Sequence, residues 1–348
     1  MMSTVVPSAI AESPTGGVDG LDAIMRRAGE ELRERMALAE LHLGRVTAQA
    51  GAPLASHANA TIVAGGKRLR PLLVVLAAES AGGPPDSAEG EERLVRAAVA
   101  VELVHSATLV HDDLIDGAQL RRGRPTVAAV AGRGLAIATG DLLFSRAFAE
   151  LARNDDAEQL RALSQASSAL AAGELLQRED AYAPHVAVER YLRRCELKTA
   201  ALFEAACRLG ALTAAGASGA LADALGAFAR RIGLAFQMLD DVLDVSGPVE
   251  RTGKSRGRDL LDGTVTLPLI LAREREQELA AFDLASLKRP DQAEALCERI
   301  AATGALDEAR EQALAVVADA KAALPAILPG GRSVLLEMVA DAVVERYR

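Results

Sequence analysis

The segment LDAIMRRAGEELRERMALAELHLGRVTAQ (Leu21–Gln49) decides the fold class, because its apolar residues recur every three or four positions. That spacing predicts helix, with an apolar stripe made of Leu21, Ile24, Met25, Ala28, Leu32, Met36, Ala39 and Leu43. Ala, Leu, Glu and Arg, which are strong helix formers, dominate the rest of the chain as well. No sustained alternation of β-branched and aromatic residues occurs, so the sequence predicts an all-α protein without a sheet.

Glycine and proline punctuate this helical sequence and predict ten or more helices joined by short loops. No repeat of fixed period and no long linker divides the 348 residues. We therefore expect one all-helical domain over residues 21–348. Residues 1–20 are rich in Ser, Pro, Gly and Val, and we expect them to form a flexible leader.

Composition narrows the functional classes. The net charge of −9 argues against a nucleic-acid partner. No apolar run approaches the roughly 18 residues of a membrane span, so we expect no integral membrane segment. A secretory signal would require a positively charged start, and the first twenty residues contain no Lys or Arg, so we expect no such signal. Three scattered cysteines form no pair motif, which favours a reducing compartment and a cytoplasmic location.

Two acidic motifs of the form DDxxD carry the strongest chemical signal. In the first, Asp112 and Asp116 are four residues apart, so both carboxylates project from one helix face. Such a motif is often a solvated helix end, but apolar residues flank this one. The second begins at Asp240 and includes Asp241 and Asp244, after the apolar run Ile232–Leu239. Oxygen ligands in this pattern suit Mg²⁺ ions that keep water and share the site with substrate phosphates.

Basic residues accompany the motifs. Gly65-Gly66-Lys67-Arg68-Leu69-Arg70-Pro71 places three cations before a predicted helix, where they could form an anion site. Arg121 and Arg122 follow the first motif and could grip phosphate or act as counter-charges to Asp112 and Asp116. The stretch Gly65–Pro71 by itself could be an ordinary basic loop on an acidic protein.

Weaker candidates lie nearer the two motifs. Lys198 and Thr199 lie in a helical stretch, and Lys254 follows the second motif. Gln237 precedes Asp240 by three residues, and His105 precedes Asp112 by two helical turns.

Together these stretches resemble the trans-isoprenyl diphosphate synthases, or polyprenyl synthetases. The matching stretches, in family order, are GGKRLRP (Gly65–Pro71), HSATLVHDDLID (His105–Asp116) followed by RRGRPT, GELLQ (Gly173–Gln177), LKT (Leu197–Thr199), GLAFQMLDDVLD (Gly233–Asp244), GKSRGRD (Gly253–Asp259) and TLP (Thr266–Pro268). The resemblance implies a single large helical bundle of the isoprenoid synthase type, with a central active-site cavity between the two acidic helices. It also implies a homodimer.

The resemblance assigns roles to individual residues. It implies head-to-tail condensation of isopentenyl diphosphate with an allylic diphosphate (geranyl, farnesyl or geranylgeranyl), assisted by three Mg²⁺ ions. Asp112 and Asp116 would hold two ions, and Asp240 the third, with Asp241 and Asp244 in support. The allylic side would be contacted by Arg121, Lys198, Thr199, Gln237 and Lys254. Isopentenyl diphosphate would be bound by Lys67, Arg70, His105 and Arg122.

Two further features bear on specificity. Family members often read Gly-Lys-x-Thr before Leu-Pro, whereas this chain reads Gly263-Thr264-Val265-Thr266, so a second diphosphate-contacting lysine is absent. Ala107 and Thr108 lie one helical turn before Asp112, where bulky aromatic residues in the family stop chain growth. These small residues favour a product of C20 or longer.

Three alternatives remain at this point. A class I terpene cyclase would share the fold and one DDxxD motif but would not need the GGKRLRP stretch. A non-catalytic subunit of a heteromeric prenyl synthase would typically lack the acidic motifs. A di-iron helical bundle needs two Glu-x-x-His pairs, and only Glu102 with His105 stands out.

Overall fold

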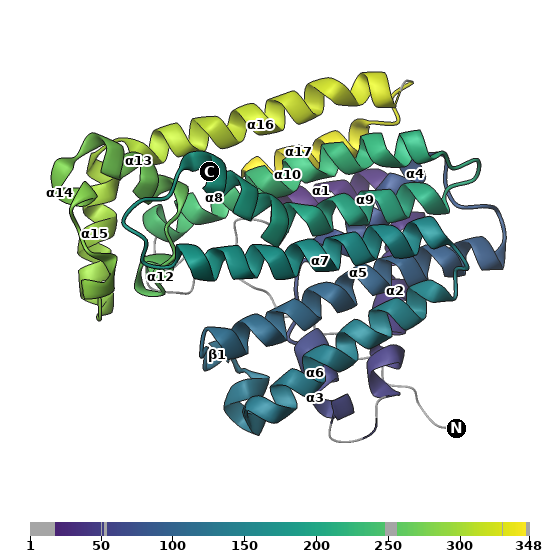
Figure 1. Ribbon diagram of the computed structural model, residues 1–348. Helices are drawn as coiled ribbons and strands as arrows, with labels where there is room; N and C mark the ends of the chain where they lie inside the picture. The colour runs from purple at the N-terminus through teal and green to yellow at the C-terminus, as the bar shows by residue number, and fades with distance from the viewer. Residues whose placement is uncertain (1–17, 50, 52–53, 248–255, 329, 346–348) are drawn as a thin grey trace.

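The computed structural model describes residues 18–49, 51, 54–247, 256–328 and 330–345 (Figure 1). The first half consists of α1 (Val18–Ala28), α2 (Glu30–Ala48), α3 (Leu54–Val63), α4 (Leu69–Ser80), α5 (Ala88–Ile115), β1 (Leu120–Arg121), β2 (Arg124–Pro125), α6 (Val127–Ala152) and α7 (Ala157–Asp180). The second half consists of α8 (Val188–Cys195), the π-helical turn η1 (Glu196–Ala200), α9 (Ala201–Thr213), α10 (Gly219–Ser246), α12 (Arg258–Leu261), α13 (Leu267–Arg275), α14 (Gln277–Ala280), the 3₁₀ turn η2 (Leu284–Ser286), α15 (Pro290–Ala302), α16 (Ala305–Ile327) and α17 (Val334–Glu345). The all-α prediction is confirmed.

Two details differ from the sequence prediction. The segment Leu21–Gln49 folds as two helices, because Gly29 adopts φ 87° and interrupts the helix between α1 and α2. Helix α1 already begins at Val18, and residues 1–17 of the expected leader lie outside the described residues. The other difference is a two-stranded antiparallel hairpin, in which Leu120 pairs with Pro125 and Arg121 with Arg124.

Helix α5 is the centre of the bundle. It packs against α2, α4, α6 and α9, and Figure 1 shows it crossing beneath α7. Its middle residues from Leu94 to Leu103 are buried, because small and aliphatic side chains face neighbours on every side. The first acidic motif occupies the last turn of this helix, so a rigid core element fixes its position.

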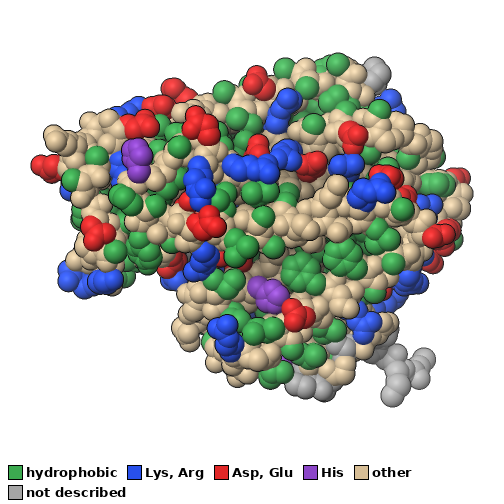
Figure 2. Space-filling model, viewed as in Figure 1, with side chains coloured by type: hydrophobic (Ala, Val, Ile, Leu, Met, Phe, Trp, Pro, Cys, Tyr) green, Lys and Arg blue, Asp and Glu red, His purple; other side chains and the backbone are tan. Residues whose placement is uncertain are grey.

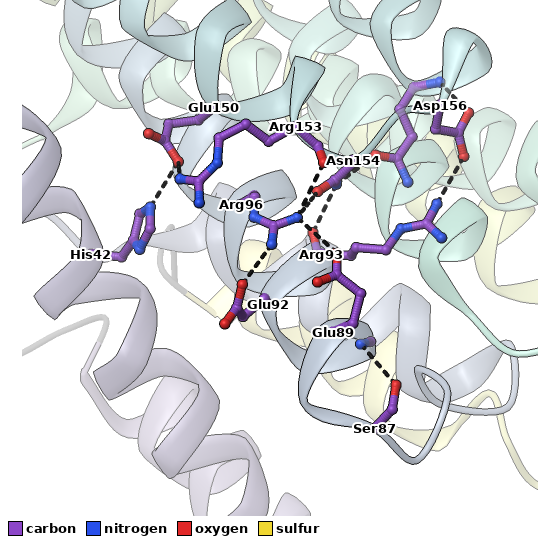
Figure 3. A network of polar contacts seen from close by, with 12 residues as sticks. His42, Ser87, Glu89, Glu92, Arg93, Arg96, Glu150, Arg153, Asn154 and Asp156 are labelled. Carbon is purple, nitrogen blue, oxygen red and sulfur yellow. Dashed lines mark hydrogen bonds and ion pairs between the residues drawn. The ribbon is translucent and has the colours of Figure 1, made fainter.

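Polar contacts join the N-terminal half of α5 to the residues at the C-terminal end of α6 (Figure 3). Arg96 is 4% exposed and donates to Asn154 Oδ1 at 3.0 Å and to Glu92 at 2.6 Å. Asn154 Nδ2 donates to the Arg93 carbonyl at 2.9 Å. Arg96 Nη1 also donates at 3.4 Å to the carbonyl of Arg153, which follows the last residue of α6.

Helices α5 and α6 are both long and apolar enough to cross a membrane by length and composition alone. The apolar window of α5 is 78% buried within the protein, as is usual for a core helix. That of α6 is only 22% buried, and Val130 and Ile137 on this helix are 61% and 38% exposed. Figure 2 shows hydrophobic side chains gathered over α5 and α6 in the lower half of the view.

Candidate active site

The three carboxylates of the first motif lie in different environments. Asp113 is buried and accepts a 2.7 Å bond from Arg121 Nε. The sequence had suggested Arg121 as a counter-charge to Asp112 and Asp116. The structure pairs its guanidinium directly with Asp113, and its charge also acts to lower the pKa of Asp112. The reason is helix geometry, since Asp113 points about 100° away from its neighbours, toward the hairpin that carries Arg121. This pair anchors the hairpin to the end of α5.

Asp116 takes part in a chain of ion pairs across three elements. Arg178 on α7 donates from Nη2 to Asp116 Oδ1 at 2.8 Å and from Nε to Glu174 Oε1 at 3.0 Å. Lys198 Nζ on η1 donates to Glu174 Oε2 at 2.5 Å. Although burial alone would raise the pKa of Glu174, Lys198 and Arg178 hold it below its ordinary value. Glu174 therefore remains ionised and connects the two cations.

The pKa of Asp112 is raised to about 6, mainly by burial and also by the negative charges of Glu174 and Asp116, against the opposing effect of Lys198. A cation nearby would stabilise the ionised form of this carboxylate. Among the described residues, no three His, Cys, Asp or Glu side chains converge as a complete metal cage.

The π-helical turn η1 positions Lys198 and Thr199. Such turns add one residue to a helix and rotate the side chains that follow, often at functional sites. Thr199 Oγ1 donates to Gln237 Oε1 at 2.7 Å, which brings together two residues that the sequence had singled out separately. Helix α7 approaches this turn closely at Gly173, where a Cβ atom would lie 2.5 Å from the Lys198 backbone nitrogen.

The second motif lies at the end of α10. Asp241 is buried and accepts bonds from the Tyr191 hydroxyl at 2.8 Å and from Gln237 Nε2 at 2.7 Å. Burial raises the pKa of Asp241 to about 7. Asp244 accepts from the backbone N–H groups of Arg258 and Asp259 and thereby holds the start of α12.

Asp259 adds a further carboxyl beside the second motif. Burial raises its pKa, and Asp244, Asp241 and Asp240 raise it further.

A cavity of about 350 Å³ opens between the two motifs. Asp116 from the first motif and Asp241 from the second both line it, and Lys198, Thr199 and Gln237 join them. Its remaining walls are Ile115, Gln177, Arg178, Ala181, Tyr182, Arg194, Cys195, Asp259, Leu261, Asp262, Thr264 and Thr266. Asp112 and Asp240 are not among the lining residues. Lys254 lies outside the described residues.

A second, basic group surrounds His105. The pKa of His105 falls well below its ordinary value, because the ring is buried and because Arg70, Arg122, Arg121 and Arg68 all lie near it. The two-turn spacing had aimed His105 at the acidic motif, whereas the structure surrounds the ring with arginines. The neutral ring can accept or donate a hydrogen bond without adding charge.

Within this group, Arg70 is poised for an anion. Its pKa is lowered to about 10, mainly by burial and also by nearby Arg122, against the opposing effect of Glu102. Its Nε atom is buried without a hydrogen-bond partner among the described residues. Its guanidinium lies 5.0 Å from the centre of the Phe203 ring. An anionic ligand would supply a negative charge to balance these guanidinium groups.

Arg68 has a different role from the two cations on either side of it. It adopts φ 47° and bonds Glu40 and Glu102, each at 2.8 Å, so its side chain holds the loop in place. Lys67 is exposed on the same loop. Gly66 approaches the Arg122 guanidinium so closely that a Cβ atom would lie 2.9 Å from Nη1.

The two residues expected to control chain length lie in the last part of α5. Ala107 is fully buried in the core. Thr108 is half-buried and donates to the His105 carbonyl at 2.8 Å.

Sequence reasoning missed several residues of the site, among them Arg178, Glu174 and Tyr191. GELLQ was noticed as a family stretch, but nothing in it showed that Glu174 pairs with Lys198, 24 residues away. Arg178 and Tyr191 stand outside the quoted motifs altogether. Their contacts depend on how α7 and α8 pack beside α5 and α10.

This fold and cavity define a class of protein: an all-helical enzyme in which two aspartate-rich helix ends and a set of cations line one cavity of about 350 Å³. The polyprenyl synthetase family model matches residues 52–303, and the chain belongs to that family. It is therefore a transferase of the prenyl diphosphate synthase type.

Individual relatives support the assignment. Heptaprenyl diphosphate synthase component 2 of Geobacillus stearothermophilus is 41% identical over 251 residues, which cover 72% of this chain and 76% of the relative. Geranylgeranyl diphosphate synthase of Methanosarcina mazei is 38% identical over 288 residues, which cover 81% and 86% of the two chains. Among solved structures, a polyprenyl synthase from Caulobacter crescentus CB15, complexed with calcium and isoprenyl diphosphate, superposes with a TM-score of 0.84. It is 34% identical, and the match covers 97% of this chain and 100% of that one.

Proposed function

We propose that this protein condenses isopentenyl diphosphate head-to-tail with an allylic diphosphate and makes a polyprenyl diphosphate of C20 or longer. The observation that carries the proposal is that Asp116 and Asp241, from motifs more than a hundred residues apart, line one cavity together with Lys198. Without cations, these carboxylates would repel one another. A magnesium diphosphate supplies the missing positive charge and fills the space.

The acidic motifs would hold three Mg²⁺ ions, with Asp112 and Asp116 binding two and Asp240, supported by Asp241 and Asp244, binding the third. When bound, the ions neutralise the charge that develops on the leaving diphosphate. The solved relative with bound calcium and isoprenyl diphosphate supports a divalent metal at this site. Lys198, Thr199, Gln237, Arg121 and Lys254 would hold the allylic diphosphate.

The basic group would bind the second substrate. Lys67, Arg70, His105 and Arg122 would orient isopentenyl diphosphate through its diphosphate. The allylic C–O bond breaks, the resulting cation alkylates the isopentenyl double bond, and a proton then passes to the departed diphosphate. The protein contributes orientation, charge and exclusion of water, and the reaction needs no protein nucleophile.

Product length is proposed from Ala107 and Thr108, where no aromatic ring blocks the helix face before Asp112. The names of relatives agree with a long product, since they include geranylgeranyl and heptaprenyl diphosphate synthases. One of these relatives is named as component 2 of its enzyme, so the test below also asks whether activity requires a second polypeptide.

We also propose that the enzyme is a cytoplasmic homodimer. All three cysteines are free and buried, which suits a reducing compartment. The exposed apolar side of α6 is a surface that a second copy could cover.

The test is a product assay with purified protein, Mg²⁺, isopentenyl diphosphate and each of dimethylallyl, geranyl, farnesyl and geranylgeranyl diphosphates. We expect linear products of C20 or longer, and we expect Asp112→Asn to abolish turnover while the protein remains folded. Cyclic hydrocarbons would identify a terpene cyclase instead. No turnover with any primer, alone or with a partner subunit, would overturn the proposal, and products of C15 or shorter would overturn the chain-length part.

A further inference from the structure

The cavity has three basic lining residues among those that the structure describes: Arg178, Arg194 and Lys198. Arg194 belongs to the scaffold, because its side chain is 4% exposed. It donates to Asp180 at 3.2 Å and to the Val265 carbonyl at 2.6 Å. Lys198 already has an expected role in diphosphate binding. Arg178 is left without a role in the proposed function.

Arg178 is placed to exchange partners. Two of its nitrogen atoms bond Asp116 and Glu174, yet its side chain is 45% exposed and that of Asp116 is 35% exposed. Exposed ion pairs of this kind contribute little stability, so an incoming anion can compete for the guanidinium. The bond to Glu174 would keep the side chain directed at the cavity during that exchange.

One position in the cavity wall lacks a positive charge. Thr264 lines the same cavity, in the loop where the sequence lacks a lysine. Its backbone N–H donates to the Asp259 carbonyl at 2.8 Å, which fixes the loop, but its short hydroxyl side chain carries no positive charge.

We propose that Arg178 is a further diphosphate-binding residue of this enzyme and supplies the positive charge that Thr264 cannot. A diphosphate entering the cavity displaces Asp116 from the guanidinium, and Arg178 then binds two diphosphate oxygens. Asp116 is thereby released from its ion pair. The inference rests on the proposed function, since both concern the same site.

The experiment measures binding of inorganic diphosphate by calorimetry, at fixed Mg²⁺, to five forms of the full chain. These are the unchanged protein, Arg178→Gln, Arg178→Lys, Arg178→Gln with Thr264→Lys, and Arg161→Gln. Arg161 is the control, because it lies exposed on the same helix and pairs only locally with Glu158. Thermal melting of each form verifies that it is folded.

We expect Arg178→Gln to weaken diphosphate binding about tenfold or more, as for the loss of charged hydrogen bonds. Arg178→Lys should retain part of the affinity, Thr264→Lys should restore part of it to Arg178→Gln, and Arg161→Gln should change nothing. In turnover assays, the KM of Arg178→Gln for the allylic substrate should rise more than kcat falls.

Unchanged diphosphate affinity in folded Arg178→Gln would overturn the inference and leave the proposed function intact. A second outcome would also overturn it: Arg178→Gln loses diphosphate affinity, Thr264→Lys does not restore that affinity, and Mn²⁺ binding without diphosphate weakens equally. In that case Arg178 would only position Asp116. If the unchanged protein binds no diphosphate with Mg²⁺ and makes no product, the proposed function itself fails, and this inference fails with it.

Discussion

At the scale of single residues, Asp241 is a buried carboxyl of the second motif with a side-chain donor at each of its oxygens. Tyr191 and Gln237 donate to its two oxygens, and the residue is only 4% exposed although it lines the cavity. Burial still dominates, because the pKa is raised to about 7 in spite of these bonds. The ionised carboxylate of Asp241 therefore destabilises the folded protein without metal, and a bound cation would offset this effect.

This cost predicts a pH dependence of stability. Between about pH 4 and 7 the folded protein holds a proton on Asp241 that the unfolded chain does not, so its contribution to the free energy of unfolding falls as pH rises. Asp241→Asn removes this titration. The free energy of unfolding of the variant, relative to that of the unchanged protein, should therefore rise by on the order of 2–4 kcal/mol between pH 5 and pH 8.

The measurement is denaturant unfolding of both proteins in EDTA at the two pH values. The lost acceptor oxygen lowers the stability of the variant equally at both, so only the difference between pH 5 and pH 8 is informative. An equal stability gap at the two values would contradict the raised pKa.

At the scale of elements, the close approach of α7 to η1 sets the position of Lys198. Gly173 allows the two backbones to meet, because a Cβ atom there would lie 2.5 Å from the Lys198 nitrogen and 2.8 Å from its Cα. These are main-chain atoms, which cannot rotate away as a flexible side chain would. A larger residue must therefore push η1 away from α7.

We expect Gly173→Ala to lower the free energy of unfolding by about 1–3 kcal/mol through overpacking and to reduce kcat, since Lys198 and Thr199 move with the turn. Gly44→Ala in α2 is the matched control, because nothing lies within 4 Å of the added atom. That variant should gain up to about 1 kcal/mol from helix propensity and keep full activity. If Gly173→Ala matches Gly44→Ala in both assays, the close approach does not set the site.

At the scale of the whole molecule, the exposed apolar side of α6 contrasts with the buried α5 beside it. Val130 and Ile137 are 61% and 38% exposed, and they lie on either side of Gly132, where a φ of 81° kinks the helix. A second copy of the chain that covered this side would also remove apolar surface from water near the first acidic motif.

Val130→Glu combined with Ile137→Glu should shift the protein from dimer to monomer, because two charges would be buried in an apolar interface. Sedimentation velocity at several concentrations measures the change. Val334→Glu on α17 is the control, since Val334 is also 38% exposed but lies on another helix. A dimer that survives the double change would place the interface elsewhere, and a monomeric unchanged protein would refute the homodimer proposal.

The sequence alone determined the all-α class, the family and the two acidic motifs. These depend on local properties, namely helical periodicity, strong helix formers and carboxylates four residues apart, and such properties are written into short stretches such as Asp112–Asp116. The basic stretches around Lys67 and Arg121 were visible for the same reason.

Only the tertiary structure decided which side chains meet. It paired Arg121 with Asp113, joined Asp116 to Lys198 through Arg178 and Glu174, and placed Tyr191 on Asp241. These contacts join residues on separate elements, and their geometry depends on helix packing, on the turn at η1 and on the close approach at Gly173. No spacing along one helix encodes that packing, because it arises from many side chains filling the core together.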